Sequence, residues 1–190
     1  MDYKDYISYL RKNRINKHFL NSDSDKRKTV YLELLKNAKS HLRFFAGNLS
    51  DEITNSEEFV EGISDFIENE GKLEIILNKF DETVARNSNL YKRLAFYASR
   101  GYNISVMKTP IEVTIKLNEK DTPVNFAVSD TNAYRLEVDV DKRNALCNMN
   151  DEEFSQKLID TFQKLSSNSQ TIKVDLIDLF SLKPNKKAND

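Results

Sequence analysis

Apolar residues recur along the chain with two spacings, and the change of spacing separates helices from strands. Spacings of three and four, typical of amphipathic helices, occur over residues 2–18, 24–38, 56–70, 87–100 and 151–165. Short apolar or alternating runs, typical of strands, occupy residues 41–46, 72–77, 102–107, 111–117, 124–128, 133–138 and 145–149. Strands and helices therefore alternate at first, and closely spaced strands follow before a last helix.

This order predicts an α/β fold with a mixed, mostly parallel β-sheet flanked by helices. After Pro110 the short strands are separated by turns, and we expect all of them to join the sheet as antiparallel hairpins. We divide the chain into a helical N-terminal arm (1–27), an α/β domain (28–165) and a C-terminal extension (166–190). The polar end of the extension, PNKKAND, is predicted to be disordered.

Composition places the chain among soluble globular proteins, with 39% hydrophobic and 31% charged residues and a net charge of −1. No apolar run approaches the ~18–20 residues that span a bilayer, and the N-terminus lacks an apolar signal-peptide core. The single Cys147 excludes an internal disulfide. We therefore expect a cytoplasmic protein without membrane contact.

Charge is spread unevenly, because residues 1–43 contain eleven Lys or Arg against five Asp or Glu. Four cations of the N-terminal arm stand among aromatic residues and are predicted to bind nucleic acid: Arg11, Lys12, Arg14 and Lys17. Two alternatives stay open. The arm could instead dock on a partner through its apolar residues, which are Tyr6, Ile7, Leu10 and Ile15. Its charges could also simply be solvated and pair with the acidic remainder of the chain.

Four segments resemble the phospholipase D-like fold. YLELLKNAKSHLRFFAGNLSD is similar to its opening helix and strand, KLEIIL to its second strand, and ALCNMNDEEFSQKLIDTFQKL to its closing strand and helix. Residues 125–137 resemble its signature hairpin, with matches at Phe126, Val128, Asp130, Arg135 and Glu137. The resemblance covers residues 28–165 and implies the same fold for them.

The resemblance also implies a loss of chemistry. Active relatives use a His nucleophile, a Lys two residues later that holds the phosphate, and an Asp that orients the His. Here Asn125 stands at the His position and Ala127 at the Lys position. A carboxamide is no substitute for an imidazole nucleophile, and a methyl group cannot stabilise a phosphorane-like transition state. We therefore expect no phosphodiesterase activity by this mechanism.

A remnant pocket is expected where the active site would lie. Arg135 and Glu137 are two residues apart and so share one strand face. Its predicted members are Asn125, Asp130, Arg135, Glu137 and Asn148. Arg135 either binds a small phosphorylated ligand, which would make the chain a sensor, or forms a structural ion pair with Glu137. A further alternative is a metal-dependent nuclease that uses Asp130 and Glu137 with Mg²⁺.

No other motif in the sequence indicates a catalytic or metal-binding site. The two histidines, His18 and His41, and Cys147 do not form a zinc set, and no metal or cofactor is predicted. The leading interpretation is a noncatalytic binding or assembly module that contacts nucleic acid or a partner protein. The resemblance includes small accessory proteins of prokaryotic or phage defence systems. Because related domains pair two copies around their active site, a homodimer is expected.

Overall fold

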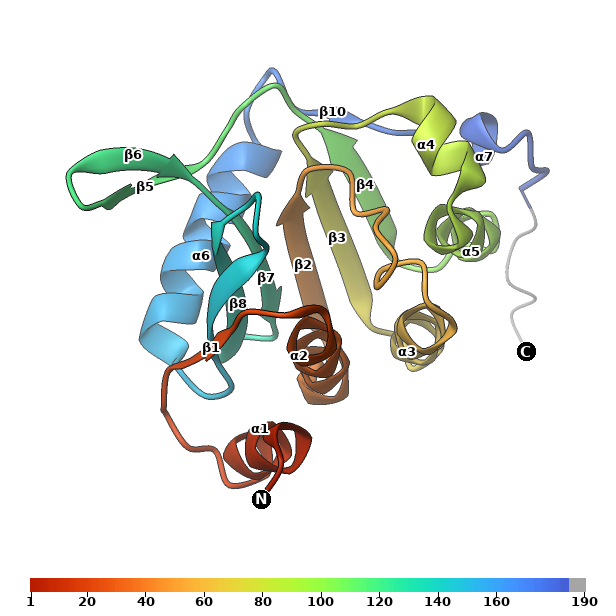
Figure 1. The fold of residues 1–190 in the computed structure, drawn as a ribbon. Helices are drawn as coiled ribbons and strands as arrows, with labels where there is room; N and C mark the ends of the chain where they lie inside the picture. The colour runs from red at the N-terminus through yellow and green to blue at the C-terminus, as the bar shows by residue number, and fades with distance from the viewer. Residues whose placement is uncertain (185–190) are drawn as a thin grey trace.

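The computed structural model describes residues 1–184. Its centre is an eight-stranded sheet in the order β1-β9-β8-β7-β2-β3-β4-β10, with a separate hairpin, β5-β6 (Figure 1). The strands are β1 (Phe19–Asn21), β2 (His41–Ala46), β3 (Lys72–Leu77), β4 (Ile104–Lys108), β5 (Thr114–Leu117), β6 (Lys120–Pro123), β7 (Asn125–Ser129), β8 (Ala133–Asp139), β9 (Asn144–Asn148) and β10 (Ile172–Lys173). The helices are α1 (Tyr3–Lys12), α2 (Ser24–Asn37), α3 (Glu57–Glu68), α4 (Glu82–Asn87), α5 (Asn89–Ala98), α6 (Glu152–Ser166) and α7 (Leu176–Leu179).

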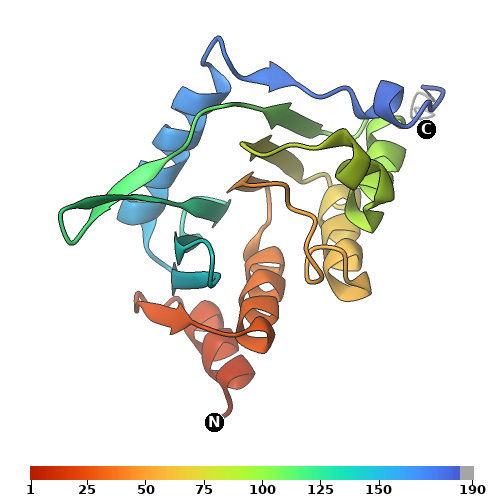
Figure 2. The ribbon, with the colours of Figure 1, turned by 45° about the horizontal axis from the view of Figure 1, so that its top comes forward.

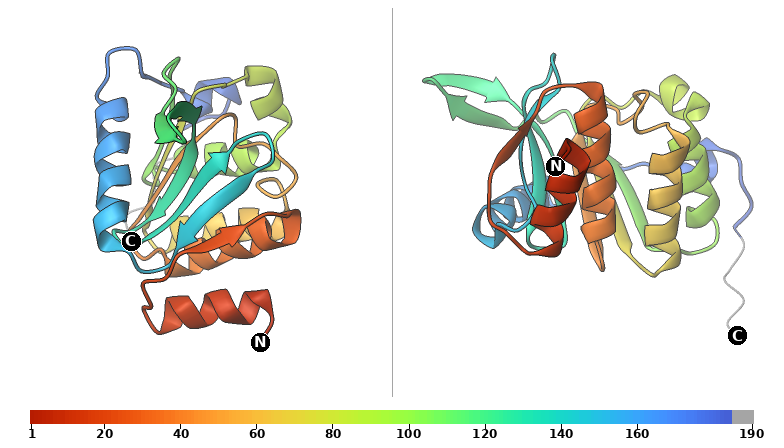
Figure 3. Two further views of the ribbon diagram at one scale, coloured as in Figure 1. Left: turned by 60° about the vertical axis from the view of Figure 1, so that its left-hand side comes forward. Right: turned by 60° about the horizontal axis from the view of Figure 1, so that its bottom comes forward.

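The predicted mixed sheet is confirmed, but among the described residues only two of its seven strand pairs, β2–β3 and β3–β4, are parallel. Strands β2, β3 and β4 are parallel, whereas β7, β8 and β9 follow as antiparallel neighbours. Helices α2, α3 and α5 cover one face of the sheet and α6 covers the other, as the two views of Figure 3 show. One apolar core lies under α2, α3 and α5, and a second lies between α6 and strands β2, β7 and β8.

The helix expected over residues 2–18 is shorter, because α1 ends at Lys12. Arg14 has a φ of 52°, and the N–H groups of Arg14 and Ile15 bond back to the carbonyls of Arg11 and Leu10. This bond pattern is a Schellman motif, which stops a helix at a left-handed residue. The chain then runs into β1, an unpredicted strand that pairs with β9 through Phe19 and Cys147. The arm thus belongs to the same sheet as the α/β domain.

Residues 111–117 were expected to join the main sheet, and that prediction is wrong. Strand β5 pairs only with β6, and the hairpin projects from the body of the molecule (Figure 2). Asn118 and Glu119 join the two strands with φ values of 48° and 65°. Two successive left-handed residues characterise the tight turn that suits a two-residue hairpin loop. This turn therefore joins β5 and β6 into a two-stranded ribbon that is separate from the main sheet.

The apolar part of the C-terminal extension packs on the domain. Strand β10 pairs with β4 at the sheet edge, and α7 contacts α5. Leu176 and Leu179 of α7 are buried in the first core. Most of the end predicted to be disordered, residues 185–190, lies outside the described residues.

Candidate binding groove at the carboxyl edge of the sheet

A groove of about 690 Å³ opens where the parallel strands β2 and β3 end. Its other walls are the β1–α2 connection, the β8–β9 turn and the β5–β6 hairpin. The carboxyl edge of parallel strands is the usual place for a ligand site in α/β proteins, and the volume lies in the range of ligand pockets, about 300–1,000 Å³. The sheet topology therefore places the candidate site here.

Asparagines make the floor of this groove. Asn48 follows β2 and Asn78 follows β3, and Asn125 begins β7 beside them. The parallel ladder continues past the strands, because the N–H of Asn78 donates to the Ala46 carbonyl at 3.0 Å. Asn78 Oδ1 is buried and has no hydrogen-bond partner among the described residues. Carboxamides both donate and accept, so this floor suits a ligand or surface with amide-like groups.

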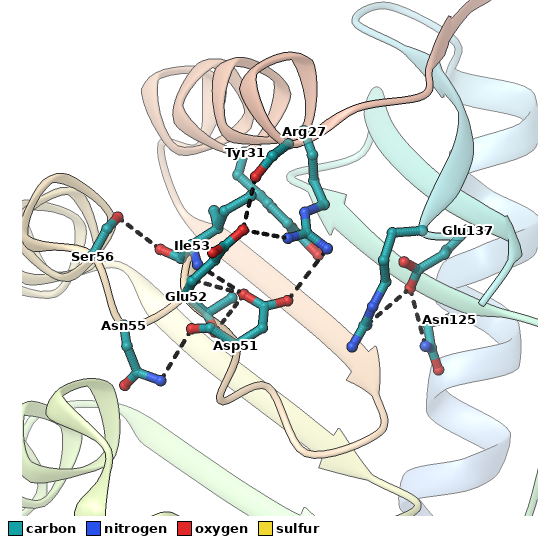
Figure 4. A network of polar contacts seen from close by, with 12 residues as sticks. Arg27, Tyr31, Asp51, Glu52, Ile53, Asn55, Ser56, Asn125 and Glu137 are labelled. Carbon is teal, nitrogen blue, oxygen red and sulfur yellow. Dashed lines mark hydrogen bonds and ion pairs between the residues drawn. The ribbon is translucent and has the colours of Figure 1, made fainter. Parts of the chain in front are cut away.

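Asn125 is held in place by a buried carboxylate. Its Nδ2 donates to Glu137 Oε2 at 3.0 Å, across the β7–β8 pair (Figure 4). Arg135 Nη2 lies 3.5 Å from Glu137 Oε1, and the side chains of Arg135 and Glu137 are each only 2% exposed. The three side chains share one sheet face, as the strand period predicts. The prediction that Asn125, Arg135 and Glu137 lie together is therefore correct.

Arg135 is fully engaged inside the protein. Its Nε donates to Asn21 Oδ1 at 3.0 Å, and Nη2 donates to the Arg143 carbonyl at 2.9 Å. Its guanidinium lies 4.9 Å from the ring centroid of Tyr31. Burial opposes the charge, but Tyr31 and Glu137 outweigh this effect and raise the pKa of the Arg135 guanidinium. The same burial raises the pKa of the Tyr31 hydroxyl. The geometry favours the structural ion pair over a phosphate sensor.

Beneath Asn125 the remaining space is almost filled. A cavity of about 10 Å³ lies between Phe44, Asp51, Arg135 and Glu137. That volume holds about one water molecule at most. Asp51 closes its far side, with Oδ2 3.6 Å from Arg27 Nη1 and Oδ1 accepting the N–H of Ile53 at 3.0 Å (Figure 4). A phosphoryl group does not fit here, so any ligand must lie in the open groove above.

Two predicted members of the pocket lie elsewhere. Asp130 stands in the β7–β8 turn, where its carboxylate accepts the N–H groups of Lys39, Ser40 and His41 at 2.8–2.9 Å. Burial acts against its charge, but these hydrogen bonds lower the pKa of Asp130. Asn148 is buried at the same end of the sheet, where its Nδ2 donates to Asn16 Oδ1 at 2.7 Å. Both side chains therefore fasten loops and do not line the groove.

The positions of Asp130 and Glu137 exclude the alternative in which both hold one metal ion of a nuclease site. Asn125 pairs with Glu137, whereas Asp130 follows Ser129 at the opposite end of β7, about 17 Å away at ~3.4 Å per residue. Two carboxylates so far apart cannot share one Mg²⁺, whose oxygen ligands lie at about 2.1 Å. Within residues 1–184, no three His, Cys, Asp or Glu side chains gather where they could hold a metal ion.

The two histidines also lie away from the groove. His41 begins β2 at its amino end, where Nε2 lies 2.5 Å from Glu74 Oε2. His18 Nε2 lies 3.4 Å from Asp151 Oδ2, beside the start of α6. Ala127 is buried in the first core, opposite Arg135 in the β7–β8 register. The groove therefore has no imidazole that could attack phosphorus.

The basic arm is partly used within the fold. Arg11 Nε donates to Glu33 Oε2 at 2.7 Å, so this predicted nucleic-acid residue ties α1 to α2. Ile7 and Leu10 are buried against the domain, which shows that the apolar face of α1 docks on its own chain. Lys12, Arg14 and Lys17 are exposed, and no carboxylate of the described residues forms an ion pair with them.

Sequence reasoning missed several residues of this region. Asn48, Asn78 and Lys79 follow predicted strands, and polar residues directly after parallel strands were the available signal. Asn21, Tyr31 and Arg143 surround Arg135 from segments far away in the chain, and no local pattern announces them. Cys147 lies in the same network, and burial raises the pKa of its thiol to about 12.

No protein-family model and no curated protein sequence matches the chain. Several solved structures do match the chain. One is Nuc from Salmonella typhimurium, a phospholipase D family member, with a TM-score of 0.54 and 11% identity over 84% of this chain and 98% of that one. The chain has the phospholipase D-like fold. NucT from Helicobacter pylori matches similarly, with a TM-score of 0.54 and 12% identity over 84% of this chain and 99% of that one.

A third match is TrmBL2, an archaeal chromatin protein whose structure shows a mode of DNA binding. Its TM-score is 0.57 at 14% identity, over 90% of this chain and 61% of that one. At these low sequence identities, the structural similarity supports the phospholipase D-like fold and nothing beyond it. No helix within residues 1–184 is both long and apolar enough to cross a membrane.

Proposed function

We propose that this chain is a noncatalytic module of phospholipase D-like fold that assembles with protein through its groove, with a second copy of itself as partner. The observation that carries the proposal is that neither histidine reaches the groove and that Asn125 is bonded to the buried Glu137. Phosphoryl transfer through a covalent histidine therefore has no nucleophile, whereas the groove keeps the volume and accessibility of a binding surface.

The character of the groove supports a protein surface as its occupant. The rim exposes apolar side chains, with Leu20 67% and Leu117 42% accessible. Lys79 and Arg143 provide positive charge, and the acids of the wall are Glu112, Asp139 and Asp141. A symmetric dimer needs a self-complementary patch, and a patch that carries both signs of charge fulfils this requirement.

Light scattering tests the assembly. We expect a mass of twice 22.1 kDa for the wild type and a shift to the monomer in Leu117→Asp. Val84→Asp is the matched control, because Val84 is 38% exposed on α4 and does not line the groove. A monomeric wild type at the highest soluble concentration would refute the self-association, and equal behaviour of the two variants would move the interface elsewhere.

Hydrolysis of bis(p-nitrophenyl) phosphate and of single-stranded DNA tests the noncatalytic part. We expect no turnover above background, with or without EDTA. Activity that copurifies with the chain and disappears in Asn125→Ala would contradict the proposal.

Nucleic-acid binding by the N-terminal arm is a second candidate, favoured by the exposed Lys12, Arg14 and Lys17. The fold similarity to TrmBL2, described as a DNA-binding chromatin protein, agrees with it. Binding to duplex DNA should weaken steeply with salt and be lost when the three cations become Ala. Arg11→Ala is the control, because Arg11 is paired with Glu33. A triple variant that binds duplex DNA as tightly as the wild type would exclude the arm as the binding site.

A further inference from the structure

A second hollow lies between α5 and the segment after α7. These elements stand at the opposite end of the molecule from the β5–β6 hairpin (Figure 1). Its volume is about 530 Å³. Lys92, Arg100 and Lys183 provide three cations, and the remaining walls are Phe96, Ser99, Phe180 and Leu182. No carboxylate lines it, and the described residues form no ion pair with any of the three cations. Unlike the groove, this hollow carries charge of one sign.

The periodicity of α5 creates this surface. Lys92, Phe96 and Arg100 are four residues apart, so they form a stripe on one side of the helix and its C-terminal turn. The opposite side buries Leu90, Leu94 and Ala95 in the first core. The stripe is therefore displayed on a rigid, well-packed element.

Phe96 and Arg100 form a preorganised stack at the rim of the hollow. The guanidinium lies 3.5 Å from the ring centroid of Phe96, and Nη1 donates to the Phe96 carbonyl at 3.2 Å. Phe96 is nevertheless 41% exposed. A guanidinium held flat on a ring offers its outer face for stacking, while its remaining N–H groups can donate to phosphate.

We propose that this hollow is a binding site for single-stranded nucleic acid, separate from the groove and from the N-terminal arm. A base stacks on the Arg100–Phe96 pair, and Lys92 and Lys183 contact the adjacent phosphates. An unpaired strand fits better than a duplex, because a recessed site lined by aromatic rings admits bases that are free of a partner strand. The proposal goes beyond the assembly function, because it concerns different residues and a different ligand.

Fluorescence anisotropy with labelled oligo(dT) of 15 nucleotides tests this site. Three phosphate contacts, from Lys92, Lys183 and the free N–H groups of Arg100, predict that affinity falls about 20-fold between ~50 and ~200 mM salt. Lys92→Ala/Arg100→Ala/Lys183→Ala should abolish binding at the higher salt. Phe96→Ala should weaken it by about 5- to 150-fold, the loss of one stacked base. Because all four positions lie at the surface or its edge, the variants should retain the wild-type melting temperature.

The matched control is Lys116→Ala/Lys157→Ala/Lys164→Ala, which removes the same number of exposed positive charges from elements away from α5 and should leave oligo(dT) binding intact. A 15-base-pair duplex and a poly-glutamate peptide serve as competitors, and both should displace oligo(dT) poorly. Three results would overturn the proposal: no binding at ~50 mM salt, α5 variants that bind like the wild type, or displacement by poly-glutamate as efficient as by unlabelled oligo(dT).

Discussion

Arg135 and Glu137 carry opposite charges in a part of the molecule from which water is excluded. Each is stabilised by the other and by hydrogen bonds to fixed neighbours, among them Asn21 and Asn125, and Arg143 Nη1 also lies 3.7 Å from Glu137 Oε2. A buried pair of this kind adds little net stability compared with an apolar pair, but the loss of one partner leaves a charge without compensation. Its role here is to fix Asn125 at the groove floor.

Arg135→Met should therefore lower the free energy of unfolding by about 3–5 kcal/mol, measured by urea denaturation at neutral pH. The double variant Arg135→Met/Glu137→Gln should recover part of the loss, because it leaves no buried carboxylate with only the more exposed Arg143 as its ionic partner. Lys157→Met is the control, because it breaks only an exposed ion pair with Glu153 and should leave the free energy of unfolding nearly unchanged. A loss that the double variant does not reduce would exclude the uncompensated charge as its cause.

The ionisation of Glu74 makes the stability of the fold depend on pH. Its hydrogen bond to His41, opposed by burial and aided by Lys72, lowers the pKa of Glu74 to about 2. A depressed carboxyl pKa stabilises the fold above the unfolded value and loses this contribution as pH falls toward the folded one. Between about pH 4.5 and pH 2, the wild type should thus lose about 1–2 kcal/mol through this residue, allowing for its partial exposure.

Denaturant titrations of wild type and Glu74→Gln at successive pH values measure this contribution. The variant should be less stable at neutral pH, and the gap between the two proteins should close by about pH 2. A gap that is independent of pH would show that the carboxylate charge is not responsible.

Period-two alternation allowed Arg135 and Glu137 to be placed on one face from sequence, because strand geometry is local. It did not reveal that Asp130 fastens the α2–β2 connection, because this depends on which loop lies across the sheet. The neighbours Asn21 and Tyr31 were equally hidden, since each comes from a segment more than a hundred residues away.

At the scale of elements, local signals decide where helices stop. Helix α3 ends at Glu68, and Glu70 beyond its cap has a left-handed φ of 66°. At Gly71, which follows, a Cβ would meet the Phe66 ring at 2.4 Å. Close packing against Phe66 therefore requires glycine at position 71. The end of α1 was missed because an arginine, and not a glycine, takes the left-handed conformation. The β5–β6 ribbon was missed because Asn118-Glu119 is a weaker turn signal than Asn-Gly.

Arg14→Gly should raise the free energy of unfolding by about 0.5–1 kcal/mol, because glycine adopts the left-handed conformation without a steric penalty. Thermal unfolding followed by circular dichroism measures the gain. Asn13→Gly is the contrasting change, because Asn13 has a φ of −93° and caps α1, so it should lose stability. A destabilised Arg14→Gly would mean that the arginine side chain contributes more than its backbone costs.

At the scale of the whole molecule, the arm and the extension predicted at the two ends each add a strand to the one sheet. Strand β1 pairs with β9 and strand β10 pairs with β4. Alternation of strands and helices was enough to predict the parallel centre, but edge strands of two or three residues carry too little pattern to be recognised.

A single cooperative unfolding transition should therefore include both ends. Leu10→Ala in α1 and Leu179→Ala in α7 should each shift the whole transition by about 2–5 kcal/mol, with tyrosine fluorescence and circular dichroism coinciding. Tyr9→Ala, at a position 47% exposed, should change little. An early separate transition in either leucine variant would show that the end in question unfolds independently.

The pairing of β1 with β9 has a consequence for biosynthesis. The ribosome makes Phe19 first and its partner Cys147 only after most of the chain has emerged. Helix α2 and the parallel strands can associate early, but β1 has no neighbour to pair with until β8 and β9 have formed. The nascent protein thus carries an unpaired strand through most of its synthesis, and closing this edge is among the last steps of its folding.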